Sequence, residues 1–287
     1  MRFAWIREHL AEFDVTCMCD TLNVSRSGFY AWRSRPAGKK TLAREALVKK
    51  VRQVHAQSRG IYGSPRVHAE LVAQGDAACV NTVAKYMRQA GIRSKVTRRF
   101  RVRTTDSGHG LAVAPNRLDR RFDEVEAPDR AWCTDITYVP TAEGFLYVAA
   151  VIDVFSRRVV GWAMDDHLRA ELCVAALSMA IARRAPGKGL LHHSDRGVQY
   201  ACLQYQQVLE ANGIEASMSR KGDCYDNAMI ESFWGTLKRE LTHHELYPTR
   251  DDARRSIFEY IEVFYNRQRR HSAIGYVSPE QFEASLN

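Results

Sequence analysis

Three carboxylates stand at positions where an acidic side chain is costly unless it has a use. Asp135 lies in the middle of the alternating segment Trp132–Val139, and Asp is disfavoured in the interior of a strand. Asp195 follows a short apolar segment, and Glu231 lies beside the apolar stripe of a predicted helix. A buried carboxylate costs free energy unless it is paired or bound to a metal. The three residues are therefore candidates for chemistry.

Hard oxygen ligands of this kind suit Mg²⁺ or Mn²⁺. In two-metal phosphoryl transfer, such ions activate the attacking oxygen and stabilise the leaving one. Carboxylates are needed because neutral ligands could not hold two dications near a polyanionic substrate. Spacing alone does not select this triple, since the chain of 287 residues has 33 acidic residues and offers many other combinations.

Hydrophobic periodicity predicts the elements that must position these groups. From residue 131 onward it predicts three successive strands, which indicates an antiparallel meander, followed by alternating helices and strands. This order is typical of an α/β body rather than a bundle or a sandwich. The predicted strands are 132–139, 145–154, 159–164, 190–193 and 214–219, and the predicted helices are 170–184, 203–212, 226–241 and 250–267.

The basic residues are concentrated in the N-terminal third of the chain. Residues 1–104 contain 21 Lys and Arg against 7 Asp and Glu, a net charge of +14, whereas the other 183 residues carry −5. A basic region joined to a slightly acidic body indicates a polyanion-binding module attached to a second activity. A solvated basic surface without a partner is the alternative.

The N-terminal third contains two candidate helix-turn-helix units. Residues 1–35 predict two short helices around a turn, with Ser25 as the N-cap of the second. Further helices are predicted at 42–57, 66–73 and 81–90, with Asn81 as a cap and Gly91 as a stop.

A basic arm follows these helices. Six of the eleven residues from Arg93 to Arg103 are Arg or Lys, which favours a strand or extended segment lying along phosphates. A solvated linker is the alternative reading. The arm contains four predicted DNA-binding residues: Lys95, Arg98, Arg99 and Arg101.

The remaining composition points to a cytoplasmic protein. The seven cysteines are scattered without a Cys-x-x-Cys pair, which argues against a disulfide framework. The N-terminus lacks the apolar core of a signal peptide, and no run reaches the roughly 20 apolar residues needed to span a bilayer.

Several motifs around the three carboxylates resemble one family closely. They are Trp132–Tyr138 (WCTDITY), His193–Tyr200 (HSDRGVQY) and Ser217–Phe233, and 35 residues separate Asp195 from Glu231. The same resemblance extends to 151–158, 265–272 and the N-terminal helical regions. The chain is similar to bacterial insertion-sequence transposases related to retroviral integrases, specifically the OrfB product of the IS-three-type group, whose DDE group is named for this spacing.

The resemblance implies a fold class and a domain order. We expect an α/β, ribonuclease-H-like integrase core with a mixed five-stranded sheet, preceded by an all-α basic helix-turn-helix region. The expected divisions are a helix-turn-helix-like segment at 1–35, a helical basic DNA-binding region at 41–104, a linker at 105–127 and the catalytic core with C-terminal helices at 128–287.

The resemblance also implies an activity. A DDE transposase catalyses Mg²⁺-dependent cleavage at the DNA 3′ end of an insertion element and then strand transfer, and Mn²⁺ is expected to substitute. Asp135, Asp195 and Glu231 would be both the catalytic residues and the ligands of two ions. Lys238 and Asn227 share a helix face with Glu231 and would contact element-end DNA.

The expected partners are double-stranded DNA, as element inverted repeats and target, and further copies of the chain on that DNA. An upstream OrfA product would be a fusion partner, and no membrane is involved. We expect the protein in the bacterial cytoplasm, associated with the nucleoid. Two other functions stay open: a catalytically degenerate DNA-binding regulator, and a host-adapted ribonuclease-H-like nuclease without strand transfer.

Other polar and aromatic residues near the motifs are interpreted as structural. Asp153 is expected to be buried in support of the fold, and Asp226 to cap a helix. The pair His192 and His193 is expected to pack rather than to bind metal. The aromatic residues of the third motif, Phe233 and Trp234, are expected in the core.

Overall fold

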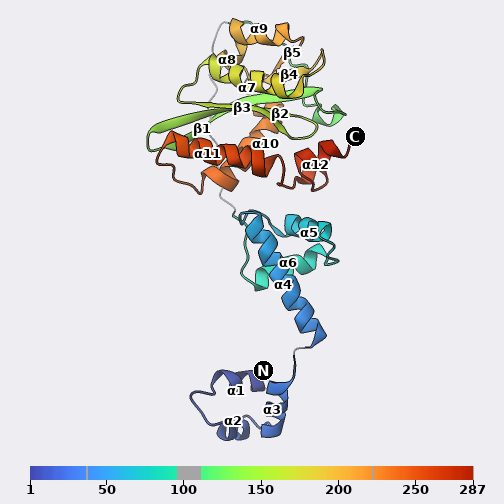
Figure 1. Ribbon diagram of the computed structural model, residues 1–287, viewed down its shortest axis with the longest axis vertical. Helices are drawn as coiled ribbons and strands as arrows, with labels where there is room; N and C mark the ends of the chain where they lie inside the picture. The colour runs from blue at the N-terminus through green and yellow to red at the C-terminus, as the bar shows by residue number, and fades with distance from the viewer. Residues whose placement is uncertain (37, 96–110, 222, 287) are drawn as a thin grey trace. The chain divides into compact units, whose positions relative to one another are not determined.

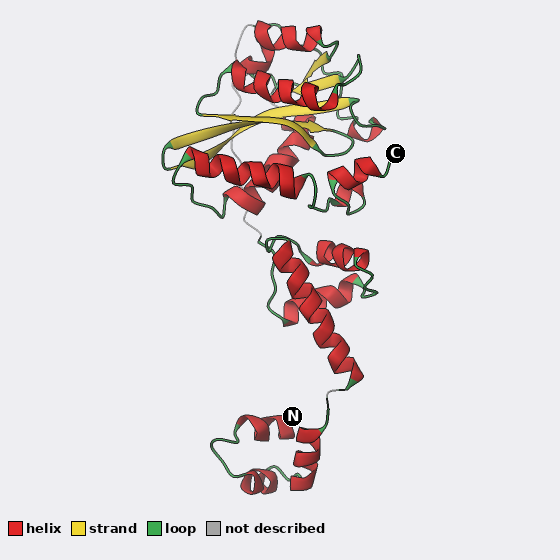
Figure 2. Ribbon diagram, viewed as in Figure 1, coloured by secondary structure: helices red, strands yellow, loops and turns green. Residues whose placement is uncertain are grey.

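The computed structural model describes residues 1–36, 38–95, 111–221 and 223–286 (Figure 1). The chain divides into two compact units, Met1–Val54 and His55–Asn287. Figure 2 shows that the strands all lie in the second unit, whereas the first is helical in its described residues.

The second unit is built on the expected mixed five-stranded sheet, whose strand order is β3-β2-β1-β4-β5. Strands β1 (Ala131–Thr141), β2 (Gly144–Asp153) and β3 (Val159–Asp165) form the predicted antiparallel meander. Strands β4 (Leu191–Ser194) and β5 (Glu215–Met218) extend the sheet in parallel with β1. The fold class predicted from the sequence is confirmed.

Helices cover both faces of this sheet. Figure 1 shows α7 (Ala170–Arg184), α8 (Val198–Ala201) and α9 (Leu203–Ala211) on one face, and α10 (Ala228–Leu237) and α11 (Arg250–Glu259) on the other. The apolar core under α7 and α9 is formed by buried residues that include Trp132, Val151, Leu172, Leu177, Tyr205 and Met218.

Gly161 explains how closely α7 approaches the sheet. A Cβ atom at this position would lie 2.2 Å from the carbonyl oxygen of Ala176 and 2.7 Å from the backbone nitrogen of Ala180. Both contacts are with backbone atoms of α7, so a side chain at position 161 would push the helix away from β3.

Two helices predicted as continuous are irregular at their ends. The segment predicted as 226–241 begins with a 3₁₀ turn at Cys224–Asn227, continues as α10, and widens into a π-helical turn at Lys238–Thr242. Similarly, α11 passes into a π-helical segment at Tyr260–Tyr265. Such turns are frequent near functional sites, and hydrophobic periodicity does not distinguish them from α-helix.

Besides α8, three short helical elements were not predicted from the sequence. They are a 3₁₀ turn at Phe122–Glu124, a second at Ser272–Ile274, and α12 (Pro279–Ala284). Helix α12 begins with a capping box in which Ser278 and Gln281 satisfy each other's backbone N–H groups. Each element spans two turns or fewer, which is too short for periodicity to register.

Residues 1–35 contain three short helices, where the sequence predicted two. They are α1 (Arg2–Glu8), α2 (Val15–Thr21) and α3 (Arg26–Ser34), and they enclose a small core of Ile6, Met18, Cys19 and Phe29. The predicted cap is confirmed, because Ser25 Oγ accepts a hydrogen bond from the Gly28 N–H at 3.0 Å.

Three longer helices follow in the basic third: α4 (Lys39–Gln57), α5 (Ser64–Ala73) and α6 (Val80–Gln89). Asn81 was predicted as the cap of α6, and this is wrong: Cys79 holds the N-cap position, without a capping hydrogen bond from its side chain to the backbone, and Asn81 lies in the first turn. Gly91 has a φ of +67° just beyond the helix and acts as the predicted stop.

The predicted basic arm falls mainly outside the described residues, and this includes Arg98, Arg99 and Arg101. Lys95 is described and exposed, and its backbone N–H donates to the Gly60 carbonyl at 2.8 Å. Across the described residues, no helix combines the length and apolar character that a membrane crossing requires.

Residues 111–127, the described part of the predicted linker, lie against the core. The backbone N–H of Arg117 donates to Ser217 Oγ at 2.9 Å, and Leu118 is only 3% exposed. Met218 N–H also donates to the Pro115 carbonyl at 3.4 Å. This segment therefore covers β5, the edge strand of the sheet.

Candidate active site

The strand register brings Asp135 and Asp195 to the same level of the sheet. Cys133 of β1 pairs with His193 of β4 in a parallel ladder. Asp135 is two residues beyond Cys133, and Asp195 is two residues beyond His193, just past the end of β4. Adjacent parallel strands thus carry the two carboxylates at the same level: Asp135 from the middle of β1, and Asp195 from just beyond the carboxyl end of β4.

Two hydrogen bonds fasten α10 to β1 around Asp135. The side-chain amide of Asn227 donates to the Thr134 carbonyl at 3.2 Å, and the indole N–H of Trp234 donates to Asp135 Oδ2 at 3.1 Å. These residues stand four before and three after Glu231, so all three share one face of the helix. Glu231 is exposed at this face.

The negative charges of Asp195 and Glu231 both act on the carboxyl group of Asp135. Burial raises the pKa of Asp135 well above its ordinary value, and the negative charges of Asp195 and Glu231 raise it further. Hydrogen bonds from the Ile136 N–H and Trp234 act in the opposite direction. Like charges gathered in this way repel one another, and a bound cation would relieve the repulsion.

Lys238 lies near this group on the segment that continues α10. Its ammonium is 5.6 Å from the centre of the Tyr138 ring, which is a cation–π distance. Burial lowers the pKa of Lys238, while the charge of Asp135 opposes that effect. A positive charge thus lies near Asp135, and the predicted contact of Lys238 with DNA stays a prediction.

The side chain of Asn227 faces into the protein. It is 4% exposed and holds β1 through the bond to Thr134. Its predicted contact with DNA stays a prediction. Trp234, interpreted from the sequence as core alone, is 5% exposed and also binds Asp135. Its i+3 spacing from Glu231 was the available signal, because a buried indole N–H needs an acceptor.

The histidines before Asp195 have the expected packing role. His193 Nδ1 lies 2.9 Å from Ser217 Oγ, and His192 Nε2 lies 3.1 Å from the Tyr205 hydroxyl. Burial lowers the pKa of His192 to about 3 and that of His193 to about 4. Both rings are therefore neutral at pH 7 and help to hold the end of β4.

Asp153 is structural, as expected. Its carboxylate is fully buried and accepts hydrogen bonds from the Asp129 N–H at 2.7 Å and from the N–H and hydroxyl of Ser156 at 2.8 and 2.9 Å. Asp226, by contrast, does not cap a helix: α10 begins after Asn227, and the Asp226 carboxylate binds arginine side chains.

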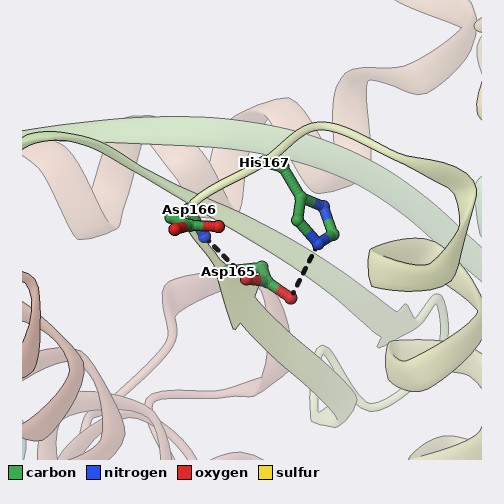
Figure 3. A group of neighbouring side chains, drawn as sticks. All are labelled: Asp165, Asp166 and His167. Atoms are coloured by element: carbon green, nitrogen blue, oxygen red, sulfur yellow. Dashed lines mark hydrogen bonds and ion pairs between the residues drawn. The ribbon is translucent and has the colours of Figure 1, made fainter.

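Figure 3 shows a second acidic group, Asp165, Asp166 and His167, at the end of β3. In the described part of the chain, it is the one group of three metal-ligand side chains whose ligand atoms all lie within 4.8 Å of one another. Asp165 accepts from the Asp166 N–H at 2.8 Å and lies 3.4 Å from His167 Nε2. The group comes from consecutive residues, and Asp166 is exposed, so local chain geometry explains its proximity.

Comparisons with known proteins match most of the chain. Residues 125–224 and 212–279 match families described as integrase core domains, and residues 42–100 match an HTH-like domain. The chain is 43% identical to the transposase InsF for insertion sequence IS3A of Escherichia coli (strain K12), over 99% of this chain and 98% of that protein. It is 44% identical to an uncharacterized 31 kDa protein of insertion element IS600 from Shigella sonnei, over 92% and 97%.

Solved structures give a more distant likeness. A chain of the simian T-cell lymphotropic virus intasome, in complex with a PP2A regulatory subunit, is 14% identical and has a TM-score of 0.46, with coverage of 80% of this chain and 73% of that one. The HTLV-2 integrase catalytic core, in complex with magnesium, is 16% identical with a TM-score of 0.43, over 54% and 97%.

Proposed function

Because the chain belongs to the integrase-core transposases of IS3-type insertion sequences, we propose that it cleaves the 3′ ends of its element and joins them to target DNA. The observation that supports this proposal is the parallel pairing of β1 with β4, which sets Asp135 beside Asp195, together with the charge of Glu231 on α10 acting on Asp135.

The donor set suits a divalent cation. Three carboxylates supply only oxygen, the ligand that Mg²⁺ prefers, and their mutual repulsion favours a cation between them. We propose that Asp135, Asp195 and Glu231 hold two Mg²⁺ ions, for which Mn²⁺ can substitute. Such ions supply Lewis-acid activation of the attacking oxygen and charge stabilisation of the leaving one.

The residues of the chain then have separable tasks. Asp135 and Asp195 are held rigidly by the paired strands, and α10 brings Glu231 to them. Water attacks phosphorus in line during cleavage, and a DNA 3′-hydroxyl does so during joining; in each case the P–O bond to the departing 3′ oxygen breaks. Lys238 and Asn227 are proposed to contact the element end, with Asn227 also holding β1.

DNA binding is assigned to the basic third and its HTH-like domain. Lys95, Arg98, Arg99 and Arg101 are proposed to lie along phosphates, so that binding weakens as salt rises. We further propose that several copies of the chain assemble on inverted-repeat DNA, with the upstream OrfA product as a fusion partner. We also propose that the protein acts in the cytoplasm in association with the nucleoid, because its substrate would be chromosomal DNA.

The test uses labelled duplex element ends with Mg²⁺ or Mn²⁺, with and without the upstream product. Glu231→Gln should abolish 3′ nicking and strand joining while leaving DNA binding intact. Glu210→Gln, an exposed glutamate on α9, is the matched control and should behave as wild type. Joining by Glu231→Gln at the wild-type rate would disprove the assignment of the site.

The same assay separates this function from a degenerate regulator. A regulator binds the element ends and produces neither nicks nor joined strands under any metal condition. A nuclease without strand transfer produces nicks alone. Metal-dependent joined product that disappears in Glu231→Gln distinguishes the transposase from both.

A further inference from the structure

Asp226, five residues before Glu231, lies at the centre of a charged cluster. This cluster is separate from the group of Asp135, Asp195 and Glu231. Its side chain is fully buried. Its two oxygens accept five hydrogen bonds, from the backbone N–H of Arg220 (2.9 Å), Arg220 Nε (2.9 Å), Arg220 Nη2 (2.8 Å), Arg120 Nε (2.7 Å) and Asn116 Nδ2 (3.0 Å). Two guanidinium groups therefore meet on one carboxylate.

Part of this cluster comes from the segment that precedes β1. Asn116 and Arg120 lie on the stretch that covers the edge strand β5, more than 100 residues before Asp226 in the sequence. The guanidinium of Arg120 also bonds to Asp223 and lies 5.6 Å from the centre of the Tyr225 ring. It thus touches three residues of the loop that leads into α10.

The backbone that presents Arg120 is strained. Asp119 and Arg120 have φ angles of +42° and +62°, two consecutive non-glycine residues in the left-handed region. Such conformations are unfavourable for residues other than glycine and persist only where the surrounding contacts hold them in place. Here Asp119 pairs with Arg220 at 3.2 Å while Arg120 pairs with Asp226, so both strained residues bind the same loop.

The loop held by this cluster leads directly to the proposed catalytic glutamate. Asn227, which follows Asp226, bonds to the Thr134 carbonyl next to Asp135, and α10 begins at Ala228. A shift of Asp226 would move the start of α10 and, one turn later, the carboxylate of Glu231. The sheet positions Asp135 and Asp195, whereas Glu231 is positioned by α10. The segment before β1 therefore contacts the loop that leads into the helix of the third carboxylate.

We propose that Arg120 is a positioning residue for DNA cleavage and joining: by holding Asp226 it sets the place of Glu231 relative to Asp135 and Asp195. This role rests on the proposed function of those three residues. Arg120 acts through Asp226 and is not assigned any contact with DNA or metal.

Three variants of the full chain test the role. Arg120→Gln removes the charge, and Arg120→Lys retains it without the guanidinium fork. Arg117→Gln is the matched control, because Arg117 lies on the same segment but pairs with Glu215 of β5 at 2.7 Å. Each is measured for joining rate, for the Mg²⁺ concentration that gives half the maximal rate, and for element-end binding without metal.

We expect Arg120→Gln to join about 10-fold more slowly and to need several-fold more Mg²⁺, since small misplacements of catalytic groups have effects of this size. Arg120→Lys should recover part of both losses, and Arg117→Gln should stay within about 2-fold of wild type. DNA binding should be unchanged in all three. The rise in melting temperature on adding Mg²⁺, read without DNA, should also shrink in Arg120→Gln.

Two outcomes would overturn the proposal. The first is Arg120→Gln with the wild-type rate and metal requirement. The second is equal loss of activity in Arg120→Gln and Arg117→Gln with equal falls in melting temperature, which would mean that the segment only stabilises the core. Failure of the proposed function itself is recognised separately, by joining that survives Glu231→Gln.

Discussion

Asp135 and Asp226 are both close to the start of α10, and their negative charges have opposite surroundings. Asp226 is fully buried, and the hydrogen bonds from Arg220 and Arg120 hold the pKa of its carboxyl well below the usual range. Asp135 faces Asp195 and Glu231, and burial together with their charges raises its pKa. The charge of Asp226 is thus neutralised by arginine side chains, whereas the charge of Asp135 adds to the negative charges of its neighbours.

This difference separates a structural carboxylate from one available to a ligand. Asp226 has five internal donors, so its charge is already stabilised and its contribution is to hold a loop. The group around Asp135 is unfavourable as it stands, which is typical of sites kept for function at a cost in stability. Acidic side chains near one another are thus informative only when their neighbours are known.

The largest effect that this comparison predicts is on strand joining. Asp135→Asn should reduce the joining rate by at least about 1,000-fold, because removing a metal ligand forfeits several kcal/mol of transition-state stabilisation. Asp165→Asn, in the acidic group of Figure 3, should change the rate by less than about 3-fold. The measurement is single-turnover joining of labelled element ends in Mg²⁺.

Element-end binding by both variants is the control, and it should match wild type. If Asp165→Asn were as impaired as Asp135→Asn, the result would assign the metal site to the end of β3 instead. The surroundings of the two acidic groups would then not predict which of them is catalytic.

Much of the fold could be predicted from the sequence because periodicity reports burial directly. Helix α7 was predicted at 170–184 and spans Ala170–Arg184, and the strands were placed to within two residues at each end. The parallel pairing of β1 with β4, which sets Asp135 beside Asp195, was not part of the sequence prediction. Long-range pairing of single side chains leaves no such pattern.

The contacts of Asp226 show this limit. The sequence interpretation made Asp226 a cap because a short polar side chain before an apolar stripe commonly has that role. Its actual partners include Asn116 and Arg120, which lie in a stretch without clear periodicity that was predicted as linker. An ion pair between residues that are more than 100 positions apart depends on the tertiary structure and leaves no local pattern in the sequence. Neither this pairing nor the left-handed backbone at Arg120 could therefore be predicted.

The next effect is on stability, and it concerns the satisfied carboxylate. Asp226→Asn should lower the free energy of unfolding at pH 7 by about 2 kcal/mol, the scale of hydrogen bonds to charged groups. Because the folded-state pKa of Asp226 is depressed, its contribution is present above the unfolded value of 3.8 and is lost as pH falls through the folded pKa. Urea unfolding of both proteins at pH 7 and below pH 4 measures this.

The difference between wild type and Asp226→Asn should therefore narrow in acid. A constant difference across pH would mean that the asparagine acts through packing alone. It would also weaken the contrast between the two aspartates, since charge would then not be what Asp226 contributes.

The smallest effect has the opposite sign and concerns Asp135. Without metal, Asp135→Asn should raise the free energy of unfolding by about 1 kcal/mol, because it removes a charge that Asp195 and Glu231 repel while the amide oxygen can still accept from Trp234. Adding Mg²⁺ should stabilise wild type by mass action and the variant much less, so the order of the two stabilities should reverse as the Mg²⁺ concentration rises.

Urea unfolding across a series of Mg²⁺ concentrations tests this without DNA. A metal-free Asp135→Asn variant less stable than wild type would show that the Asp135 charge is satisfied within the protein, and Asp135 would then resemble Asp226 rather than contrast with it.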